Sequence, residues 1–401
     1  MQRILTLYKN AYSGLSPATW WLSVVILINR CGTMVLPFMT LYLTESLGRS
    51  LSEAGFVMAL WGAGSIFGGI IGGKLTDKIG FYYVQVSTLL CGAVMFSILG
   101  QLKDYNTICV FTFLLSLLNE SFRPANAAAI AHYSKEENRT RSYSLNRLAI
   151  NLGWAMGGAL GGFIASKNYE LLFWIDGCTN LAAAIMLWLI LAPSKNMATK
   201  QAPKDDTIIT RSAYKDKPYL AFIILSTLFA CCFFQIFSMQ PIFYKKELLI
   251  DETGIGWLMA LNGVLIAAFE MVVVHKLERR RKAVGYIAPG VLLTGLSFAI
   301  YNVMPQIAGV ALVSMLIITA GEMLALPFMN TFWISRTNAN NRGQYAGLYT
   351  VAWSTAQVLG PAGGAIIAER WGFDVLWWVV GGVCIIASIG FKILADKTSA
   401  T

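Results

Sequence analysis

Charged residues are scarce along the whole of this sequence. Only 13% of its 401 residues are Asp, Glu, Lys or Arg, whereas a soluble domain usually carries about 25%. This deficit excludes a water-soluble protein of ordinary composition. Hydrophobic residues make up 56% of the chain, and they gather in runs of about 20 residues, the length that a helix needs to cross a bilayer. We therefore predict an all-α membrane protein.

Several kinds of reactive site are also missing. The chain has only two His, and no Ser, His and Asp set falls within the apolar runs. None of the seven Cys forms a C-x-x-C motif, and no Gly-x-x-x-x-Gly-Lys-Ser/Thr loop is present. We therefore expect no enzyme, no catalytic residue, no bound metal or cofactor, and no step driven by ATP.

The apolar runs predict twelve membrane-spanning helices in two halves of six. The longest polar gap, 193–217, is predicted to be a cytoplasmic linker between an N-terminal bundle, 1–192, and a C-terminal bundle, 218–401. The expected spans are 18–43, 52–73, 82–101, 106–132, 142–166, 170–192, 218–244, 253–275, 284–303, 306–334, 344–368 and 372–394.

The net charge of +10 does not indicate a nucleic-acid partner, because the basic residues lie between the apolar runs. Lys and Arg gather in the cytoplasmic loops of membrane proteins, next to anionic lipid. Here they concentrate in alternate gaps, which predicts a multi-pass protein of the inner (plasma) membrane with both termini in the cytoplasm. The basic gaps hold Lys74, Lys78, Lys135, Arg139, Arg141, six residues of the linker, Lys276, Arg279, Arg280, Arg281, Lys282, Arg336 and Arg342.

The two halves share a pattern of residues at one offset. Pro124 and Pro327 are 203 residues apart, and so are Gly157 and Gly360. Such a repeat predicts two pseudo-symmetric bundles with a solute site near the midplane, which rock about it to give alternating access. We expect a monomer whose partners are a small solute, protons and the lipid bilayer.

The second span ends in GGKLTDKIG. Gly73, Asp77, Lys78 and Gly80 resemble the G-x-L-x-D-[RK]-x-G loop of the major facilitator superfamily, although the basic residues that usually follow are replaced by Phe-Tyr-Tyr. The resemblance implies the major facilitator fold and a gating function for these four residues. The alternative is an ordinary solvated turn.

Two narrower resemblances point to branches of that superfamily. The fifth span, NRLAINLGWAMGGALGG, is similar to a Gly-rich motif of drug:proton antiporters. Arg30, Arg123-Pro124 and Glu322 resemble residues of the proton-dependent oligopeptide transporters, but the acids that precede the Arg in that family are absent, since Ile26 and Asn29 stand there.

Ionisable residues within the spans are candidates for the transport site, because each costs at least about 2.5–3.5 kcal/mol at mid-bilayer. The resemblance to the superfamily implies that the first, fourth, seventh and tenth spans line the cavity. Three of these four spans carry Arg30, Glu120, Arg123 and Glu322. We expect the Arg to hold an anionic group of the solute, Glu322 a cationic group, and Glu120 the proton. Glu322, Glu270 and Asp176 are alternative proton sites, and Asp176 and Glu270 fit helix packing equally well.

Uncharged polar and aromatic residues complete the predicted pocket. They are Gln235, Gln240, Asn330, Trp353 and Gln357, and each fits helix packing as well. The resulting hypothesis is a proton-coupled secondary transporter of a small organic solute, similar to drug or metabolite:proton antiporters. The alternative is a proton-coupled importer of peptide-like or zwitterionic solutes.

Overall fold

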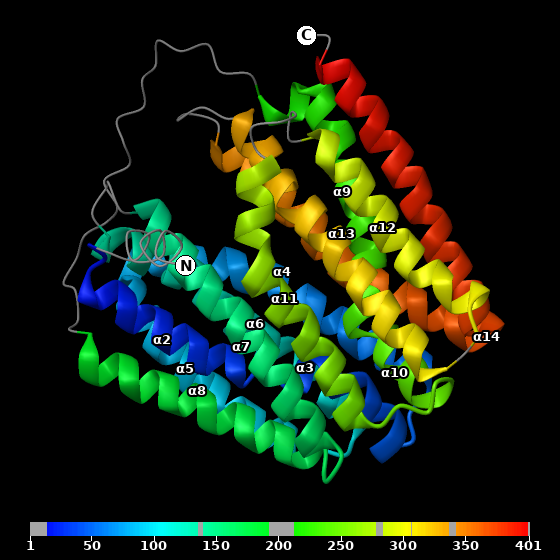
Figure 1. Ribbon diagram of the computed structural model, residues 1–401. Helices are drawn as coiled ribbons and strands as arrows, with labels where there is room; N and C mark the ends of the chain where they lie inside the picture. Colours follow the sequence, from blue (N-terminus) through cyan, green and yellow to red (C-terminus); the bar gives the residue numbers. More distant parts are fainter. Residues whose placement is uncertain are drawn as a thin grey trace, which may run out of the picture. The chain divides into compact units, whose positions relative to one another are not determined.

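The structure is a computed structural model that describes residues 14–134, 139–191, 212–277, 284–305, 307–336 and 342–399. Within these ranges the chain consists of helices joined by short connections, and no strand is found (Figure 1). Helix makes up most of the described residues in each of the twelve predicted spans, so the prediction of an all-α membrane protein is confirmed.

Ten of the helical segments in the described ranges are long and apolar enough to cross a membrane. One of them lies in α14 (Arg342–Ser399), which contains two predicted spans because its backbone turns at Gly372, where φ is 84°. The helix α6 (Tyr105–Tyr133) is 29 residues long and carries Glu120 and Arg123; it is not one of the ten. Together these helices account for the twelve spans.

Contacts between Cα atoms group the described residues into two compact units. Unit 1 draws on Met1–Leu36 and Gly64–Lys200, and unit 2 draws on Pro37–Ala63 and Gln201–Thr401. This grouping differs from the predicted halves, because residues 37–63 of the first and second spans are assigned to unit 2. The predicted division into 1–192, 193–217 and 218–401 therefore stays a prediction.

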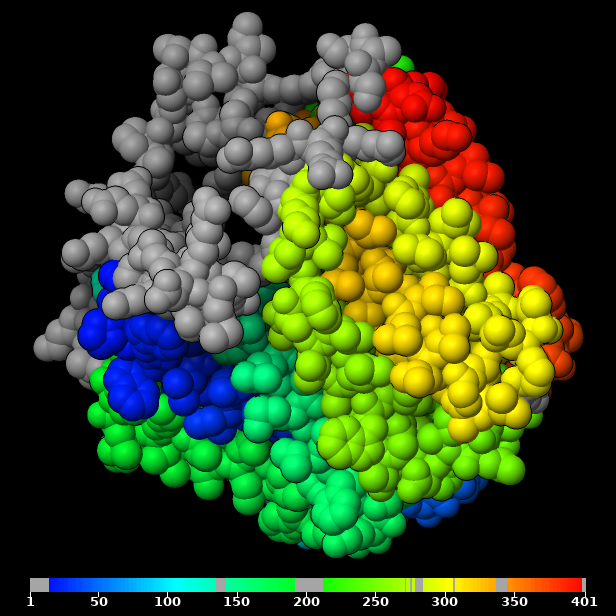
Figure 2. Space-filling view, viewed as in Figure 1, coloured from blue at the N-terminus to red at the C-terminus, as the bar shows by residue number. Residues whose placement is uncertain are grey.

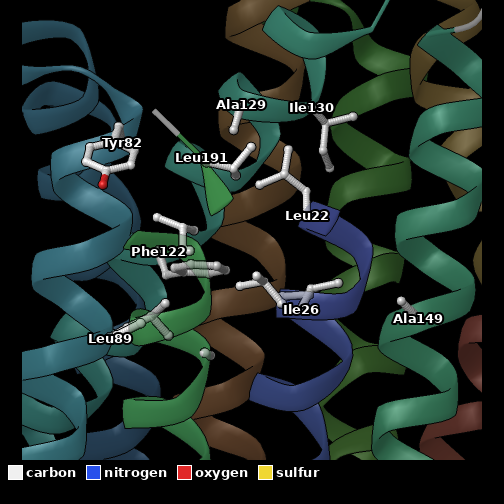
Figure 3. Packing of buried hydrophobic residues seen from close by; sticks show 13 residues of the cluster. Leu22, Ile26, Tyr82, Leu89, Phe122, Ala129, Ile130, Ala149 and Leu191 are labelled. Atoms are coloured by element: carbon white, nitrogen blue, oxygen red, sulfur yellow. The ribbon is translucent and has the colours of Figure 1, made fainter. Parts of the chain in front are cut away.

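Unit 1 is a bundle in which α5 packs on α6 and α8, and α2 packs on α7 and α8 (Figure 1). Its core includes Leu22 and Ile26 of α2, Tyr82 and Leu89 of α5, and Phe122 of α6. Figure 3 shows these side chains pointing into the space between the helices. The remaining bounds are α2 Pro17–Cys31, α5 Phe81–Leu99, α7 Arg139–Ala165 and α8 Glu170–Ile190.

Unit 2 is built around α12, which packs on both α13 and α14, while α9 packs on α14 and α11 on α13. Figure 2 shows the side chains of α12 and α13, yellow and orange, in close contact on the face that it presents. Besides α14, the helices are α9 Lys217–Phe233, α10 Met239–Lys246, α11 Glu252–Leu277, α12 Val284–Val303 and α13 Ala308–Ser335, and short helical turns cover Ala213–Lys215 and Phe234–Phe237.

The second span, α4 (Leu51–Ile79), contributes to both units. Its later half packs on α6 through glycine. A Cβ on Gly64, Gly68 or Gly72 would lie 2.4–2.5 Å from a backbone atom of α6, so only glycine permits this approach. The four-residue spacing of these glycines therefore lets α4 and α6 pack closely.

Two spans are interrupted in the middle. The first consists of α2, a break at residues 32–34, the helix α3 (Val35–Leu41) and a π-helical turn Tyr42–Ser46. The seventh consists of α9 and α10, joined by a 3-10 turn. Such interruptions leave backbone groups that other parts of the protein must satisfy within the bilayer.

Candidate functional site

Unit 1 brings together the three predicted charges of its first and fourth spans. The Arg123 Nη1 lies 3.0 Å from the Glu120 Oε2, in an i, i+3 ion pair on α6. Arg30, near the end of α2, lies within electrostatic range of both residues. Two cations and one anion give this cluster a net positive charge, which suits an anionic group of a solute.

The exposed fractions of the pair suggest an open side to the cluster. The side chain of Glu120 is 16% exposed and that of Arg123 is 71% exposed, although Arg123 lies within the 29 residues of α6. A charge at such a depth normally faces a partner or water rather than lipid. Arg30 is half-buried, and no hydrogen-bond partner of its Nε is found in the described residues.

Unit 2 holds a second cluster around Glu322 on α13. The Asn262 amide, on α11, donates to the Glu322 Oε1 over 3.1 Å and to the Thr319 Oγ1 over 3.0 Å. Glu322 is 5% exposed and Glu270 is 7% exposed, and their charges lie within electrostatic range of each other. This cluster suits a proton or a cationic group.

Asn262 and Thr319 were not among the predicted site residues. Asn262 stands eight residues before Glu270, so the two share a face of α11. Thr319 stands three residues before Glu322, and likewise shares its face of α13. The shared spacing is a signal that the sequence carries, but it does not tell which helix lies opposite.

Gln235 and Gln240 are both buried, at the interruption of the seventh span. The Gln235 Nε2 donates to the carbonyl oxygens of Gly360 (2.7 Å) and Cys231 (3.2 Å), which ties this break to α14. The Gln240 Nε2 donates to the Tyr301 hydroxyl over 2.6 Å. These contacts favour helix packing, and a contact of either residue with the solute stays a prediction.

Trp353, on α14, is half-buried in a group of aromatic rings. The ring centroids of Phe229 and Phe233, at the end of α9, and of Phe234, at the start of the following 3-10 turn, lie within 6.3 Å of its own. Tyr349, one turn before it on α14, completes the group at 6.1 Å. Such a wall fits the flat apolar part of an organic solute.

The two remaining predicted pocket residues, Asn330 and Gln357, lie on α13 and α14, the helices that carry Glu322 and Trp353. Asn330 is exposed on α13 and accepts a hydrogen bond from the Trp333 indole over 3.2 Å. Gln357 is half-buried on α14, one turn after Trp353. Asn330, Trp353, Gln357 and Glu322 thus all belong to unit 2, and a common pocket stays a prediction.

The predicted gating loop follows the end of α4. Gly80 has φ of 89° and precedes α5, a backbone conformation that favours glycine. Asp77 and Lys78 are exposed in the last turn of α4, and no ion pair or hydrogen bond of the Asp77 side chain is found among the described residues. The latch function of these residues, and of Gly73, stays a prediction.

Sequence reasoning also missed a polar network at the start of α9. The Arg336 Nε and Nη2 donate to the Asp216 carboxylate over 2.8 and 2.7 Å, and the Tyr345 hydroxyl donates to it over 2.8 Å. Burial would raise the pKa of Asp216, but these hydrogen bonds and the Arg336 charge outweigh it, so its pKa lies below the usual value of 3.8.

The fold and the charges buried in its spans define a multi-pass membrane transporter. The sequence profile of the Major Facilitator Superfamily matches residues 22–361 and 246–400. The chain therefore belongs to the major facilitator superfamily. Its members are transporters, so the prediction that the chain is not an enzyme is confirmed, as is the family resemblance of its second span.

Curated relatives cover nearly the whole chain. The uncharacterized MFS-type transporter YqjV of Bacillus subtilis (strain 168) is 23% identical over 389 residues, which are 96% of this chain and 94% of that protein. The multidrug resistance protein MdtH of Proteus mirabilis (strain HI4320) is 22% identical over 364 residues, or 88% of each chain.

Solved structures show the same fold. A peptide transporter POT in complex with alafosfalin matches with a TM-score of 0.81 and 16% identity, over 96% of both chains. The nucleoside transporter NupG matches with a TM-score of 0.76 and 15% identity, over 94% of this chain and 99% of that one. The predicted major facilitator fold is therefore confirmed.

Proposed function

We propose that this protein is a proton-coupled secondary transporter that works by alternating access as a drug or metabolite:proton antiporter. We place it in the inner membrane as a monomer with both termini in the cytoplasm. The name of the MdtH relatives, multidrug resistance protein, supports a drug-like solute, and the basic loops support the orientation.

One observation carries the proton coupling: the buried carboxylate of Glu322 has a neutral amide, Asn262, as its hydrogen-bond donor. A second buried carboxylate, Glu270, lies within electrostatic range. Two negative charges in a medium of low dielectric constant repel each other strongly. A proton on Glu322 relieves that repulsion, and a cationic solute at the same place does so as well, so the two compete.

Glu120 differs from Glu322 in its partners. Its carboxylate forms an ion pair with Arg123 and lies near a second cation, Arg30. We therefore assign Glu120 to the anion-binding cluster of unit 1 and Glu322, with Glu270, to the proton site. This assignment revises the expectation from the sequence, in which Glu120 carried the proton.

The charge layout supports an alternative, a proton-coupled importer of peptide-like or zwitterionic solutes. Arg30 and Arg123 in unit 1 suit a carboxylate, and Glu322 in unit 2 suits an amine. An antiporter and a symporter differ in the proton gradient that drives uptake. Accumulation in vesicles that are acidic inside indicates antiport, and accumulation in vesicles that are acidic outside indicates symport.

The test uses the full-length protein in proteoliposomes, with radiolabelled tetraphenylphosphonium and a radiolabelled dipeptide as probes. We expect an interior acid gradient to drive uptake of tetraphenylphosphonium. In Glu322→Gln, this accumulation is expected to be lost while exchange without a gradient continues. Glu170→Gln is the matched control, because Glu170 forms an exposed ion pair with Lys103. Full accumulation in Glu322→Gln, or loss of it only in Glu120→Gln, would overturn the assignment.

A further inference from the structure

Asp176 is a buried carboxylate that the proposed proton and solute sites do not use. It lies on α8 with no exposed surface. Its Oδ2 accepts from the backbone N–H of Val35 over 2.9 Å, and both of its oxygens lie 3.1 Å from the backbone nitrogen of Met34. Val35 is the first residue of α3 and Met34 directly precedes it, so the α8 side chain caps the second half of the first span.

The break between α2 and α3 is also held in place at the end of α2. The helix α2 ends at Cys31, and the N–H of Gly32 and Thr33 bond back to it. A Cβ on Gly32 would lie 1.7 Å from the Thr179 Oγ1 of α8. The Thr179 hydroxyl donates to the Asp176 backbone oxygen over 3.0 Å. The break therefore sits against one turn of α8.

Arg30 is positioned by the same arrangement. It is the last residue but one of α2. A Cβ on Gly153 of α7 would lie 2.5 Å from the Arg30 Cβ, and one on Gly157 would lie 3.1 Å from the Arg30 carbonyl oxygen. The end of α2 is thus confined between α7 and α8, and Arg30 has little freedom to move along the bundle.

The chain passes from unit 1 to unit 2 shortly after the break, within α3. Leu36 is the last residue of this segment in unit 1, and Pro37 is the first in unit 2. Further along α3, the Thr40 hydroxyl donates to the Ser238 carbonyl oxygen in unit 2 over 3.1 Å. A change in the angle between α2 and α3 must be taken up at residues 32–34, because helices on either side resist bending.

We propose that Asp176 is a positioning residue for transport, which anchors the start of α3 to unit 1 while α3 changes its angle to α2. Its chemistry fits this task. Orphan N–H groups at a helix start favour a negative charge, and the Met34 N–H is equidistant from both carboxylate oxygens. When α3 turns, one oxygen keeps the bond as the other releases it, and Arg30 stays in place. The proposal rests on transport by alternating access.

Hydrogen–deuterium exchange, measured by mass spectrometry on the full-length protein in detergent, tests the anchor without any solute. In Asp176→Ala we expect peptides within residues 33–41 to exchange at least tenfold faster, with α5 and α7 unchanged. Asp176→Asn keeps one acceptor oxygen, so its exchange is expected to lie between those of Asp176→Ala and the unaltered protein. Unchanged exchange over residues 33–41 in both variants would overturn the anchor.

Exchange of tetraphenylphosphonium or a dipeptide across proteoliposomes, without a proton gradient, tests the link to transport. We expect the maximal rate to fall at least tenfold in Asp176→Asn while the probe concentration at half-maximal rate changes less than twofold. An unchanged rate despite faster deuterium exchange would overturn the positioning function. If the unaltered protein moves neither probe, the proposed solute class fails, and the deuterium exchange of Asp176→Asn still decides the anchor.

Discussion

Arg336 binds the carboxylate of Asp216 with two parallel hydrogen bonds, from its Nε and Nη2, across 120 residues of sequence. Asp216 is also the N-cap of α9, where its Oδ1 accepts from the Tyr219 N–H over 3.3 Å. The side chain of Asp216 is 2% exposed and that of Arg336 is 21% exposed. The pair therefore ties the end of α13 to the start of α9 where both leave the apolar spans.

Removal of the cation is expected to destabilise unit 2. Arg336→Ala leaves Asp216 buried and without its ion-pair partner, which typically costs about 3–5 kcal/mol. Arg336→Lys keeps the charge but not the planar fork, so a smaller loss is expected. Thermal unfolding in detergent measures both. Lys103→Ala, which removes an exposed ion pair, should cost about 1 kcal/mol or less. Equal shifts in Arg336→Ala and Lys103→Ala would contradict this reading.

The same pair predicts a dependence on pH. Because the folded pKa of Asp216 is lowered, its contribution is fully present above the pKa of the unfolded chain and is lost as the pH falls through the lower folded value. The stability difference between the unaltered protein and Arg336→Ala should therefore shrink on acidification from neutral pH to about pH 3, below the ordinary Asp value. Melting temperatures of both proteins across this range measure it, and a constant difference would speak against the pair as its source.

Gly68 and Gly69 are neighbours on α4 with opposite surroundings. A Cβ on Gly68 would lie 2.4 Å from the Leu117 carbonyl oxygen, whereas one on Gly69 would meet nothing within 4 Å. Gly68→Ala should therefore destabilise unit 1 by about 1–3 kcal/mol through overpacking. Gly69→Ala should be neutral or stabilise it by up to about 1 kcal/mol, because Ala favours helix. The melting temperatures of the two variants in detergent test this prediction. Shifts of the same sign in both variants would contradict the close contact between Gly68 and Leu117.

The glycine faces illustrate what the sequence alone can predict. The spacing of Gly64, Gly68 and Gly72 places them on one side of a helix, and the apolar runs give the spans within a few residues, because both depend on local periodicity. The charged candidates follow from the cost of charge in lipid. These arguments need no knowledge of which helix lies beside which.

The contacts between helices lie beyond such reasoning. Asn262 bonds Glu322 across 60 residues, and Asp176 caps Met34 across 142. A helix that is apolar all round has no distinct face in its sequence, so neither its neighbours nor the partner of a single polar residue can be predicted. For the same reason the sequence left Asp176 open between a proton site and helix packing.

Arg123 and Glu120 are expected to act together on the solute. Arg123→Ala should weaken the binding of an anionic or zwitterionic solute by about tenfold or more, since a hydrogen bond to a charged group contributes about 1.5–3 kcal/mol. A solute found by a thermal-shift screen of metabolites and drugs provides the ligand for calorimetry. In Glu120→Gln with Arg123→Ala, the losses should not add, because the residues are in contact. Unchanged affinity in Arg123→Ala would move the anion site elsewhere.

A substitution of Tyr301 tests whether Gln240 stabilises helix packing or contacts the solute. The Tyr301 hydroxyl accepts from Gln240 over 2.6 Å and lies 2.8 Å from the Tyr244 hydroxyl, and all three side chains are buried. Tyr301→Phe leaves the Gln240 amide without this partner, at a cost of about 1–3 kcal/mol.

The matched control is Tyr286→Phe on the same helix, because its hydroxyl donates one partly buried hydrogen bond to the Leu277 carbonyl oxygen over 2.9 Å. We expect Tyr301→Phe to lower the melting temperature more than Tyr286→Phe, while solute affinity changes less than twofold in both. A tenfold loss of affinity in Tyr301→Phe without a fall in melting temperature would instead place Gln240 in the binding pocket. In that case an uncharged part of the solute contacts Gln240 on α10, and the interruption of the seventh span serves solute recognition rather than helix packing.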